Sequence, residues 1–466
     1  MKRPLSNLFS LLAGDIGSRL LGFLITAYLA RVLAPSAFGI INIGLAVLGY
    51  LMLLGSPGLQ LLEARNAAAI AGANVLRVNS VLTLRLLLAG SLLVLATLAS
   101  ILILSSSEIR ESVVLFCVSL IPLSLFLDWF FQGKEQFGLL SFAKLIMYLV
   151  YGLVVVVAVH SAADIIWVPV GFAAGHLAAT LLLLWGYRKF GTFSFAWRPD
   201  EWKSILRSSV PVGLAMFLAQ STINLPPIVL GWFASTAEAG IFSAALKIVF
   251  VLLMLDRLLN ALLLPAVTRY FASRADQVPF FLTVVMKVVL IVILPLTVLG
   301  ILSAPTIIPV VFGTGYADAV PLFRILMGYF FLTILNSVFV CSLVGAGKEN
   351  EYTSALNAGS AILVAGIVAG AAFFGSMGVA IGIVIGELST VLLMIHRTKK
   401  IVTVPLFGAF IRPLSAVVLM VATVLLLNEH ALLVQACVSL LVFTAVIVVT
   451  RGVAPEEIQF LRERFV

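Results

Sequence analysis

The sequence predicts an all-α polytopic membrane protein with about fourteen transmembrane helices, and composition, hydropathy and loop charge each point to that class. Of the 466 residues, 62% are hydrophobic and 11% are charged, whereas a soluble domain carries about 25% charged residues. Apolar stretches of roughly 20 residues follow one another, and a helix of that length crosses about 30 Å of hydrocarbon. A soluble enzyme held by a single anchor is therefore excluded.

The expected spans can be placed in order along the chain. The first apolar run follows a basic N-terminus but contains Asp15 and Arg19 and continues to about residue 29, so it is a retained span rather than a signal peptide. Hydropathy places the spans at residues 8–29, 39–62, 80–104, 111–131, 139–159, 165–187, 206–232, 239–264, 281–303, 320–344, 353–374, 377–395, 411–427 and 431–450. The longest polar stretch, 187–207, contains Trp197 and Trp202, which is typical of a segment at the membrane interface.

Loop charges test this assignment, because basic residues collect in cytoplasmic loops. With the N-terminus placed inside, the inner loops hold nearly all loop lysines and arginines, and only Arg31 and Arg110 fall in outer loops. This alternation predicts that both termini are cytoplasmic. It also explains the net charge of +9, so no nucleic-acid partner is expected.

The sequence shows no sign of a metal or cofactor site. Cys117, Cys341 and Cys437 lie far apart in apolar segments, as small buried hydrophobic residues do. The segment Gly345–Lys348 lacks the spacing and the hydroxyl residue of a phosphate-binding loop. We expect neither a cofactor nor ATP hydrolysis by the chain itself.

The two halves of the chain resemble each other at three anchors, each at the same loop or helix depth. The matched segments are Ala37–Ile41 with Glu238–Phe242, Phe131–Glu135 with Gly345–Glu349, and Gly175–Leu177 with Gly386–Leu388, at offsets of 201, 214 and 211. Two copies of six spans have the same topology, an architecture used by alternating-access transporters. We therefore predict two pseudo-symmetric six-helix lobes, at 1–200 and 201–402, followed by a helix pair and a cytoplasmic tail at 403–466.

Three motifs carry a family resemblance. They are Leu29–Gly39 between spans one and two, Asp128–Glu135 at the end of span four, and Arg207–Pro211 at the start of span seven. They resemble the polysaccharide transporter family, which holds O-antigen and other lipid-linked oligosaccharide flippases within the multidrug/oligosaccharidyl-lipid/polysaccharide exporter superfamily. The resemblance extends over essentially the whole chain.

The resemblance implies two lobes around a central cavity in the bacterial cytoplasmic (inner) membrane. It also implies movement of an undecaprenyl-diphosphate-linked oligosaccharide from the cytoplasmic to the outer leaflet, for O-antigen of lipopolysaccharide or another surface polysaccharide. The lipid bilayer and this substrate are then the partners, with a polysaccharide polymerase and glycosyltransferases as candidate protein partners.

Basic side chains within the spans are candidate ligands of the substrate diphosphate. A charge near the bilayer centre costs about 2.5–3.5 kcal/mol and normally faces protein or water, and basic residues outnumber acidic ones here. The candidates are Arg19, Lys247, Arg257 and Arg85. Lys247 has no acidic residue within one turn, and Arg257 lies within about 80° of it around a regular helix. An ion pair with Asp15, one turn away, is the alternative for Arg19, and an interfacial position is the alternative for Arg85.

Two amides are candidates for sugar binding. The offset of 201 aligns Arg19 with Gln220 and Phe23 with Asn224, so polar faces of spans one, seven and eight can border one cavity, where amides would bond sugar hydroxyls. Hydrogen bonding between helices is the alternative. Pro226–Pro227 predicts a bend near the outer end of span seven.

Four ionisable residues are candidates for coupling transport to an ion. They are Asp15, Asp256, Glu387 and His176. His176 and Glu387 occupy repeat-equivalent positions at mid-membrane depth, where an ionisable side chain can carry a proton during transport. The alternative is a neutral, hydrogen-bonded core group.

These features predict a transporter and not an enzyme. In a flippase, a hydrated basic cavity would carry the polar headgroup while the polyprenyl tail stays in lipid, and the lobes would alternate in access. A cation-coupled multidrug antiporter of the same superfamily is the closer alternative, although it would rely on central acids. A membrane glycosyltransferase or polymerase would need a large extramembrane loop, and every predicted loop is short.

Overall fold

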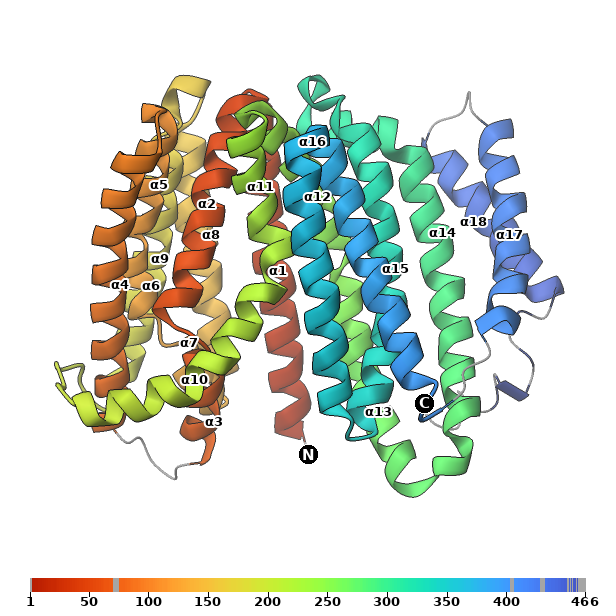
Figure 1. Ribbon diagram of the computed structural model, residues 1–466, viewed down its shortest axis with the longest axis horizontal. Coiled ribbons are helices and arrows are strands. Elements are labelled where there is room, and N and C mark those ends of the chain that lie inside the picture. Colours follow the sequence, from red (N-terminus) through yellow and green to blue (C-terminus); the bar gives the residue numbers. More distant parts are fainter. Residues whose placement is uncertain are drawn as a thin grey trace. The chain divides into compact units, whose positions relative to one another are not determined.

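The computed structural model describes residues 2–69, 75–402, 406–427 and 432–450, together with 452, 454, 456, 457 and 459. Within these residues every regular element is a helix (Figure 1). The chain separates into two compact units, Met1–Ser243 and Ala244–Val466. The finer boundaries expected at residues 200 and 402 stay predictions.

The first unit contains the helices of the first seven expected spans, and α12 (Thr236–Leu252) contains the boundary between the units. Its helices are α1 (Lys2–Val32), α2 (Pro35–Gly55), α3 (Leu59–Ala69), α4 (Val75–Ile103), α5 (Ser107–Val118), α6 (Leu120–Ser124), α7 (Asp128–Gly133), α8 (Phe137–Ala158), η1 (Ala162–Asp164), α9 (Trp167–Tyr187), α10 (Pro199–Ala219) and α11 (Ser221–Phe233).

The second unit contains longer helices and the C-terminal pair. Its helices are α13 (Met254–Ser273), η2 (Ala275–Gln277), α14 (Val278–Phe312), η3 (Thr314–Tyr316), α15 (Ala319–Gly345), α16 (Glu349–Thr398), α17 (Leu406–Leu426) and α18 (Leu432–Val449). The α17–α18 pair packs against α14 through a cluster that includes Met420 and Phe443.

The helices account for the predicted spans. Nine helical segments in the described part of the chain are long and apolar enough to cross a membrane, or ten if α10 and α11 form one bent span. Helix α16 merges the spans expected at 353–374 and 377–395, which meet at Gly375 with φ 60° and ψ −145°, a conformation that favours glycine. The remaining expected spans correspond to α1, α17 and α18.

Span seven bends at a different residue from the one expected. Helices α10 and α11 meet at Gln220 with an angle of 61°, whereas Pro226 and Pro227 lie inside α11. A proline ring clashes with the carbonyl four residues earlier, so its strain falls on the preceding turn. The bend therefore precedes the two prolines by about one and a half turns.

The N-terminal ends of α2 and α12 cross in a self-complementary contact. A Cβ on Gly39 would overlap the carbonyl of Thr236, and a Cβ on Gly240 would overlap the carbonyl of Pro35. Both pairs are related by the predicted offset, since 240 − 39 and 236 − 35 each equal 201. The contact has the symmetry expected for this offset and explains why glycine stands at both positions.

The second anchor is shifted in register. Glu135 after α7 and Gly347 after α15 both have positive φ, 55° and 69°. In both turns the next amide donates to the carbonyl five residues earlier at 2.9 Å, which is the Schellman ending of a helix. These turns match at 347 − 135, or 212, so the alignment of the Gly-Lys-Glu letters at 214 was wrong by two residues.

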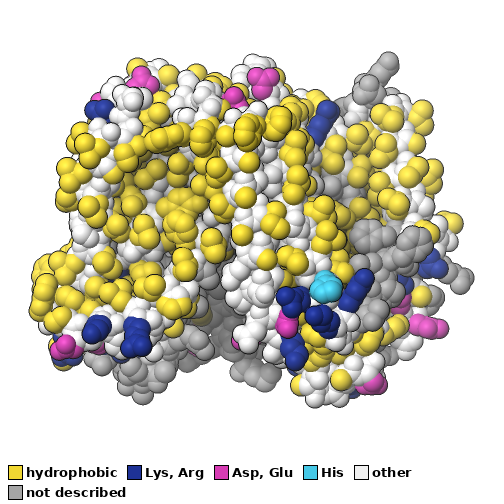
Figure 2. All heavy atoms as spheres, in the orientation of Figure 1, with side chains coloured by type: hydrophobic (Ala, Val, Ile, Leu, Met, Phe, Trp, Pro, Cys, Tyr) yellow, Lys and Arg dark blue, Asp and Glu magenta, His cyan; other side chains and the backbone are white. Residues whose placement is uncertain are grey.

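The surface has the charge distribution of a membrane protein. Figure 2 shows apolar side chains along the lengths of the helices, with charged side chains gathered near their ends. Exposed leucines such as Leu102 and Leu426, each 84% exposed, would be unfavourable in water but suit lipid. The chain is therefore a multi-pass membrane protein.

Candidate functional site

The three basic candidates of spans one and eight lie on α1, α12 and α13. In the first unit, Arg19 is half-buried in the middle of α1. In the second unit, Lys247 is half-buried on α12 and Arg257 is exposed on α13. The helix is interrupted at the single residue Leu253, and the angle of about 80° between these two residues, which assumed a regular helix, stays a prediction. The side chain of Asp15 lies outside the described residues. Diphosphate binding by these residues stays a prediction.

Arg85 on α4, in span three, contacts the break between α6 and α7 in span four. Its side chain is 3% exposed, and its Nη1 and Nη2 donate to the carbonyls of Phe126 and Leu123 at 3.2 and 3.1 Å. Leu123 lies in the last turn of α6, and Phe126 lies between α6 and α7. A helix end leaves carbonyls without intrahelical donors. Arg85 therefore supplies hydrogen-bond donors to carbonyls at this break.

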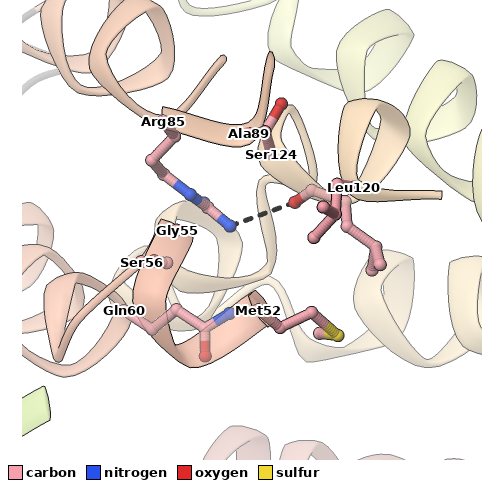
Figure 3. A pocket seen from close by; sticks show the side chains of 9 residues that line it. Met52, Gly55, Ser56, Gln60, Arg85, Ala89, Leu120 and Ser124 are labelled. Carbon is pink, nitrogen blue, oxygen red and sulfur yellow. Dashed lines mark hydrogen bonds between the residues drawn. The ribbon is translucent and has the colours of Figure 1, made fainter. Parts of the chain in front are cut away.

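A small pocket of about 30 Å³ borders Arg85 (Figure 3). Its lining residues are Met52, Gly55, Ser56, Gln60, Arg85, Ala89, Leu120, Leu123 and Ser124. Within the described residues, Arg85 Nε and Ser56 Oγ have no hydrogen-bond partner. The volume suits one or two water molecules and is too small for a diphosphate. Diphosphate binding by Arg85 stays a prediction.

Asp128 supplies the opposite charge at the same break. It is the first residue of α7, and it interacts electrostatically with Arg85. Its Oδ1 is buried and has no hydrogen-bond partner among the described residues. A carboxylate at a helix N-terminus is favoured by the helix dipole, so Asp128 and Arg85 together stabilise the two helix ends that the break creates.

The two amides of span seven differ in environment. Gln220 is half-buried at the bend between α10 and α11. Asn224 is 8% exposed and packs on Gly49 of α2, where a Cβ would lie 2.7 Å from its Nδ2. Asn224 therefore packs closely between α11 and α2. Sugar binding by either amide stays a prediction.

His176 is enclosed within the first unit. It is 8% exposed, its Nδ1 lies 2.9 Å from the carbonyl of Phe172, and its ring centroid lies 4.2 Å from that of Phe172. These contacts favour the interpretation of His176 as a hydrogen-bonded core group.

A polar cluster joins α13, α15 and α16 in the second unit. We name it the carboxylate cluster, and its members are Asp256, Asn260, Asn336, Ser337, Cys341 and Glu387. Asn260 Nδ2 donates to Asp256 Oδ2 at 3.1 Å and to Ser337 Oγ at 3.0 Å, and Ser337 Oγ donates to Asp256 Oδ1. Asn336 Nδ2 donates to Glu387 Oε1 at 3.3 Å, and Cys341 Sγ donates to Asn260 Oδ1 at 3.2 Å.

The cluster brings together two of the predicted coupling residues, Asp256 and Glu387, which are 131 residues apart in the sequence. Asn336 Oδ1 is buried with no hydrogen-bond partner among the described residues, so an acceptor oxygen remains beside Glu387. Carboxylate, amide and hydroxyl oxygens can take up a proton or coordinate a small cation. Within the described residues, no three His, Cys, Asp or Glu side chains form a metal-binding group.

Sequence reasoning missed the amides and the hydroxyl of this cluster. Asn260 lies one turn after Asp256, and Asn336 and Ser337 are adjacent polar residues in an otherwise apolar span. Polar residues spaced by four in a membrane span were the available signal.

Comparison with known proteins agrees with this architecture. A sequence family described as "Polysaccharide biosynthesis protein" matches residues 5–271. The fold is similar to a structure titled "Lipid II flippase MurJ, inward closed conformation", with a TM-score of 0.78 and 14% identity over 98% of this chain and 99% of that one.

It is also similar to an inward-facing "multidrug resistance MATE family transporter of the MOP superfamily", with a TM-score of 0.67 and 14% identity over 82% of this chain and 94% of that one. No curated protein sequence matches the chain. Because the family match covers more than half of the residues, the chain belongs to the polysaccharide biosynthesis protein family.

Proposed function

We propose that the chain is a flippase that moves a polyprenyl-diphosphate-linked oligosaccharide from the cytoplasmic to the outer leaflet of a bacterial inner membrane. The observation that carries this proposal is the fold likeness to a lipid II flippase, which covers almost all of both chains, in a chain of the polysaccharide biosynthesis family. The likeness to the MATE transporter leaves about a sixth of this chain uncovered.

The headgroup determines what the side chains must do. A diphosphate with several sugars cannot enter hydrocarbon bare, because each unsatisfied polar group costs several kcal/mol. In this proposal Arg19, Lys247 and Arg257 bind the diphosphate, with Arg85 as a further basic candidate, while Gln220 and Asn224 bond sugar hydroxyls. The polyprenyl tail remains in lipid, so only the polar part is carried.

The carboxylate cluster is our candidate for ion coupling. A transporter that favours one direction needs an ion or the membrane potential, which supplies about 2.3 kcal/mol per charge per 100 mV. Asp256 accepts hydrogen bonds from Asn260 and Ser337, and Glu387 accepts one from Asn336, the chain neighbour of Ser337 in α15. Uptake of a proton or small cation by either carboxylate would rearrange these bonds. His176 and Asp15 are further coupling candidates.

The test is transport in proteoliposomes that contain the purified chain and a fluorescent polyprenyl-diphosphate oligosaccharide. Dithionite added outside quenches only outward-facing fluorophores, so the rate of signal loss reports flipping. We expect Lys247→Ala and Arg19→Ala to lower the rate at least tenfold. Arg324→Ala is the matched control, because this exposed arginine at a helix end donates to the carbonyl of Ile301. Unchanged flipping in both test variants would remove these residues from the mechanism.

Coupling is tested in the same vesicles with imposed gradients. Glu387→Gln and Asp256→Asn keep the shape of each side chain but remove its charge. We expect them to abolish the response of flipping to a proton or sodium gradient while leaving basal exchange. An unchanged gradient response would dismiss the carboxylate cluster as the coupling site.

A cation-coupled multidrug antiporter is the second candidate, favoured by the two membrane-embedded carboxylates of the cluster and by the MATE-like fold. It predicts efflux of cationic dyes from vesicles and no flipping of lipid-linked sugar. The flippase proposal predicts the reverse. Under that proposal, glycosyltransferases would make the substrate and a polysaccharide polymerase would use the product, so these enzymes are the candidate partners. Cytoplasmic termini are part of the same proposal.

A further inference from the structure

The segment from Arg188 to Arg207 joins α9 to α10 at one end of the first unit, and its extended part is fixed to α4. We name this segment the interface loop. Asn79 Nδ2 donates to the carbonyl of Thr192 and to Ser194 Oγ, both at 2.9 Å. The amide of Ala196 donates to Thr83 Oγ1 at 3.0 Å.

A second attachment lies at the start of α10. Trp202 Nε1 donates to the carbonyl and the Oγ of Ser80 at 3.1 and 3.0 Å, and the ring is 8% exposed. Phe190 packs edge-to-face on Phe130, with ring centroids 5.2 Å apart. The loop is therefore held at both ends on buried parts of the unit.

The fixed loop presents two aromatic rings outward. Phe195 and Trp197 are each 71% exposed, while the amide of Ala196 between them donates to Thr83 of α4. This is the opposite of a loop in water, where polar groups face outward and rings are buried. Trp185, at the end of α9, adds a third ring that is 62% exposed. Tryptophan rings such as those of Trp185 and Trp197 are typical of the boundary between acyl chains and headgroups.

The loop is also basic. Five lysines and arginines against two acids give a net charge of +3 between residues 188 and 207. The carboxylate oxygens Oε1 and Oε2 of Glu201 lie 3.9 Å from Arg77 Nη1 and Arg198 Nη1, respectively. Lys203 and Arg207 are exposed, lie one turn apart on α10, and form no ion pair within the described residues. Figure 2 shows basic side chains along α10 beside an apolar surface.

We propose that the interface loop is a docking surface for anionic glycerophospholipid, with the lipid phosphate at Lys203 and Arg207 and the acyl chains against Trp197 and Phe195. Charge complementarity selects anionic over zwitterionic lipid, because anionic membrane surfaces attract adjacent lysine and arginine side chains. The anchors to Asn79 and Ser80 keep the rings in place before lipid arrives, so binding orders few additional groups.

The test uses the purified full-length chain in mixed detergent micelles that contain phosphatidylglycerol or phosphatidylcholine, with retained lipids counted by native mass spectrometry. We expect preferential retention of phosphatidylglycerol. Replacing both basic residues, as Lys203→Gln with Arg207→Gln, should weaken its apparent affinity about 30-fold. The charge-retaining pair Lys203→Arg with Arg207→Lys should bind as the wild type does, and 0.5 M salt should weaken wild-type binding.

The matched control changes two basic residues elsewhere on the surface. Lys399→Gln with Lys400→Gln removes the same charge from exposed positions after α16 and should leave the measured affinity within twofold. Trp197→Ala keeps the charge and should weaken binding, whereas Phe373→Ala, at a ring that is 78% exposed, should not. The proposal is overturned if the Lys203/Arg207 double variant retains phosphatidylglycerol like the wild type. Equal losses in the control pair would overturn it as well.

Discussion

Replacing Arg85 by methionine separates a structural role from a role in substrate binding. The variant keeps the length of the side chain but removes two charge-assisted hydrogen bonds to the carbonyls of Leu123 and Phe126. Each such bond contributes about 1–2 kcal/mol to the free energy of unfolding, a value between those typical of charged donors and of hydrogen bonds in membrane helices. Asp128 would also lose its opposite charge. The two lost hydrogen bonds alone correspond to a loss of stability of about 2–4 kcal/mol.

The assay is thermal denaturation of the purified chain in detergent, with transport measured on the same preparation. For a unit of the size of Met1–Ser243, the expected loss corresponds to a melting temperature lower by roughly 10 °C. Arg85→Lys keeps the charge but not the planar fork and should fall between. Arg324→Gln, which removes one exposed hydrogen bond, should change the melting temperature by about 1–2 °C.

The two roles of Arg85 give opposite results. If Arg85 only binds substrate, Arg85→Met is as stable as the wild type and does not transport. A double variant with Asp128→Asn provides a second measurement, because residues of one network have non-additive effects. A wild-type melting temperature for Arg85→Met, or strict additivity with Asp128→Asn, would refute the reasoning given for the helix break.

Three further changes test other contacts. Gly240→Ala places a methyl group against a backbone carbonyl, so we expect the free energy of unfolding, measured by thermal denaturation, to fall by about 1–3 kcal/mol. The control Gly90→Ala, where a Cβ meets open space, should lose no stability. Equal melting temperatures of the two variants would contradict the close crossing of α2 and α12. Lys287→Met removes the ion-pair partner of the buried Glu457, whose Oε1 lies 2.6 Å from Lys287 Nζ. We expect faster proteolytic cleavage near Glu457, and slower or unchanged cleavage would contradict this. In the turn after α8, a hydrogen bond from the His160 amide lowers the pKa of Asp164. This bond therefore stabilises the turn above the ordinary pKa of Asp and is lost as pH falls through the lowered value. Hydrogen exchange, corrected for intrinsic rates, should accelerate there in acid, and should be fast at every pH in Asp164→Asn.

The membrane class and the order of the helices could be predicted because they depend on local composition. A span needs only enough consecutive apolar residues, and every expected span corresponds to helical structure. The repeat was detectable for a similar reason, since Gly39 and Gly240 are fixed by one close contact that no larger residue allows. The second anchor failed in register because a Schellman turn depends on backbone conformation, and Glu135 adopts positive φ where its equivalent is Gly347.

Breaks within spans were harder to predict because they depend on partners far away in the sequence. Residues 120–128 read as one apolar run, yet the chain leaves the helix at Leu125, and the freed carbonyls are satisfied by Arg85 from another span. Without such a donor, the backbone of an apolar span would keep its hydrogen bonds within the helix, and the helix would stay continuous. The prolines of α11 show the same limit, since the sequence located the strain but not the turn that relieves it.

The charged residues show most clearly what one sequence contains. Depth in the membrane can be estimated from span boundaries, so Asp256 and Glu387 are identified from the sequence as charged residues inside spans. Their roles depend on what meets them, and Asn260, Asn336 and Ser337 come from other helices or other turns. Glu63 is the converse case, because it directly follows a predicted span and its sequence position gives no sign of burial. It is nevertheless buried and held by Arg77 at 2.8 Å. A charge inside a predicted span is thus identified by local sequence, whereas a buried charge outside a span, and the partner of either, is identified only by the fold.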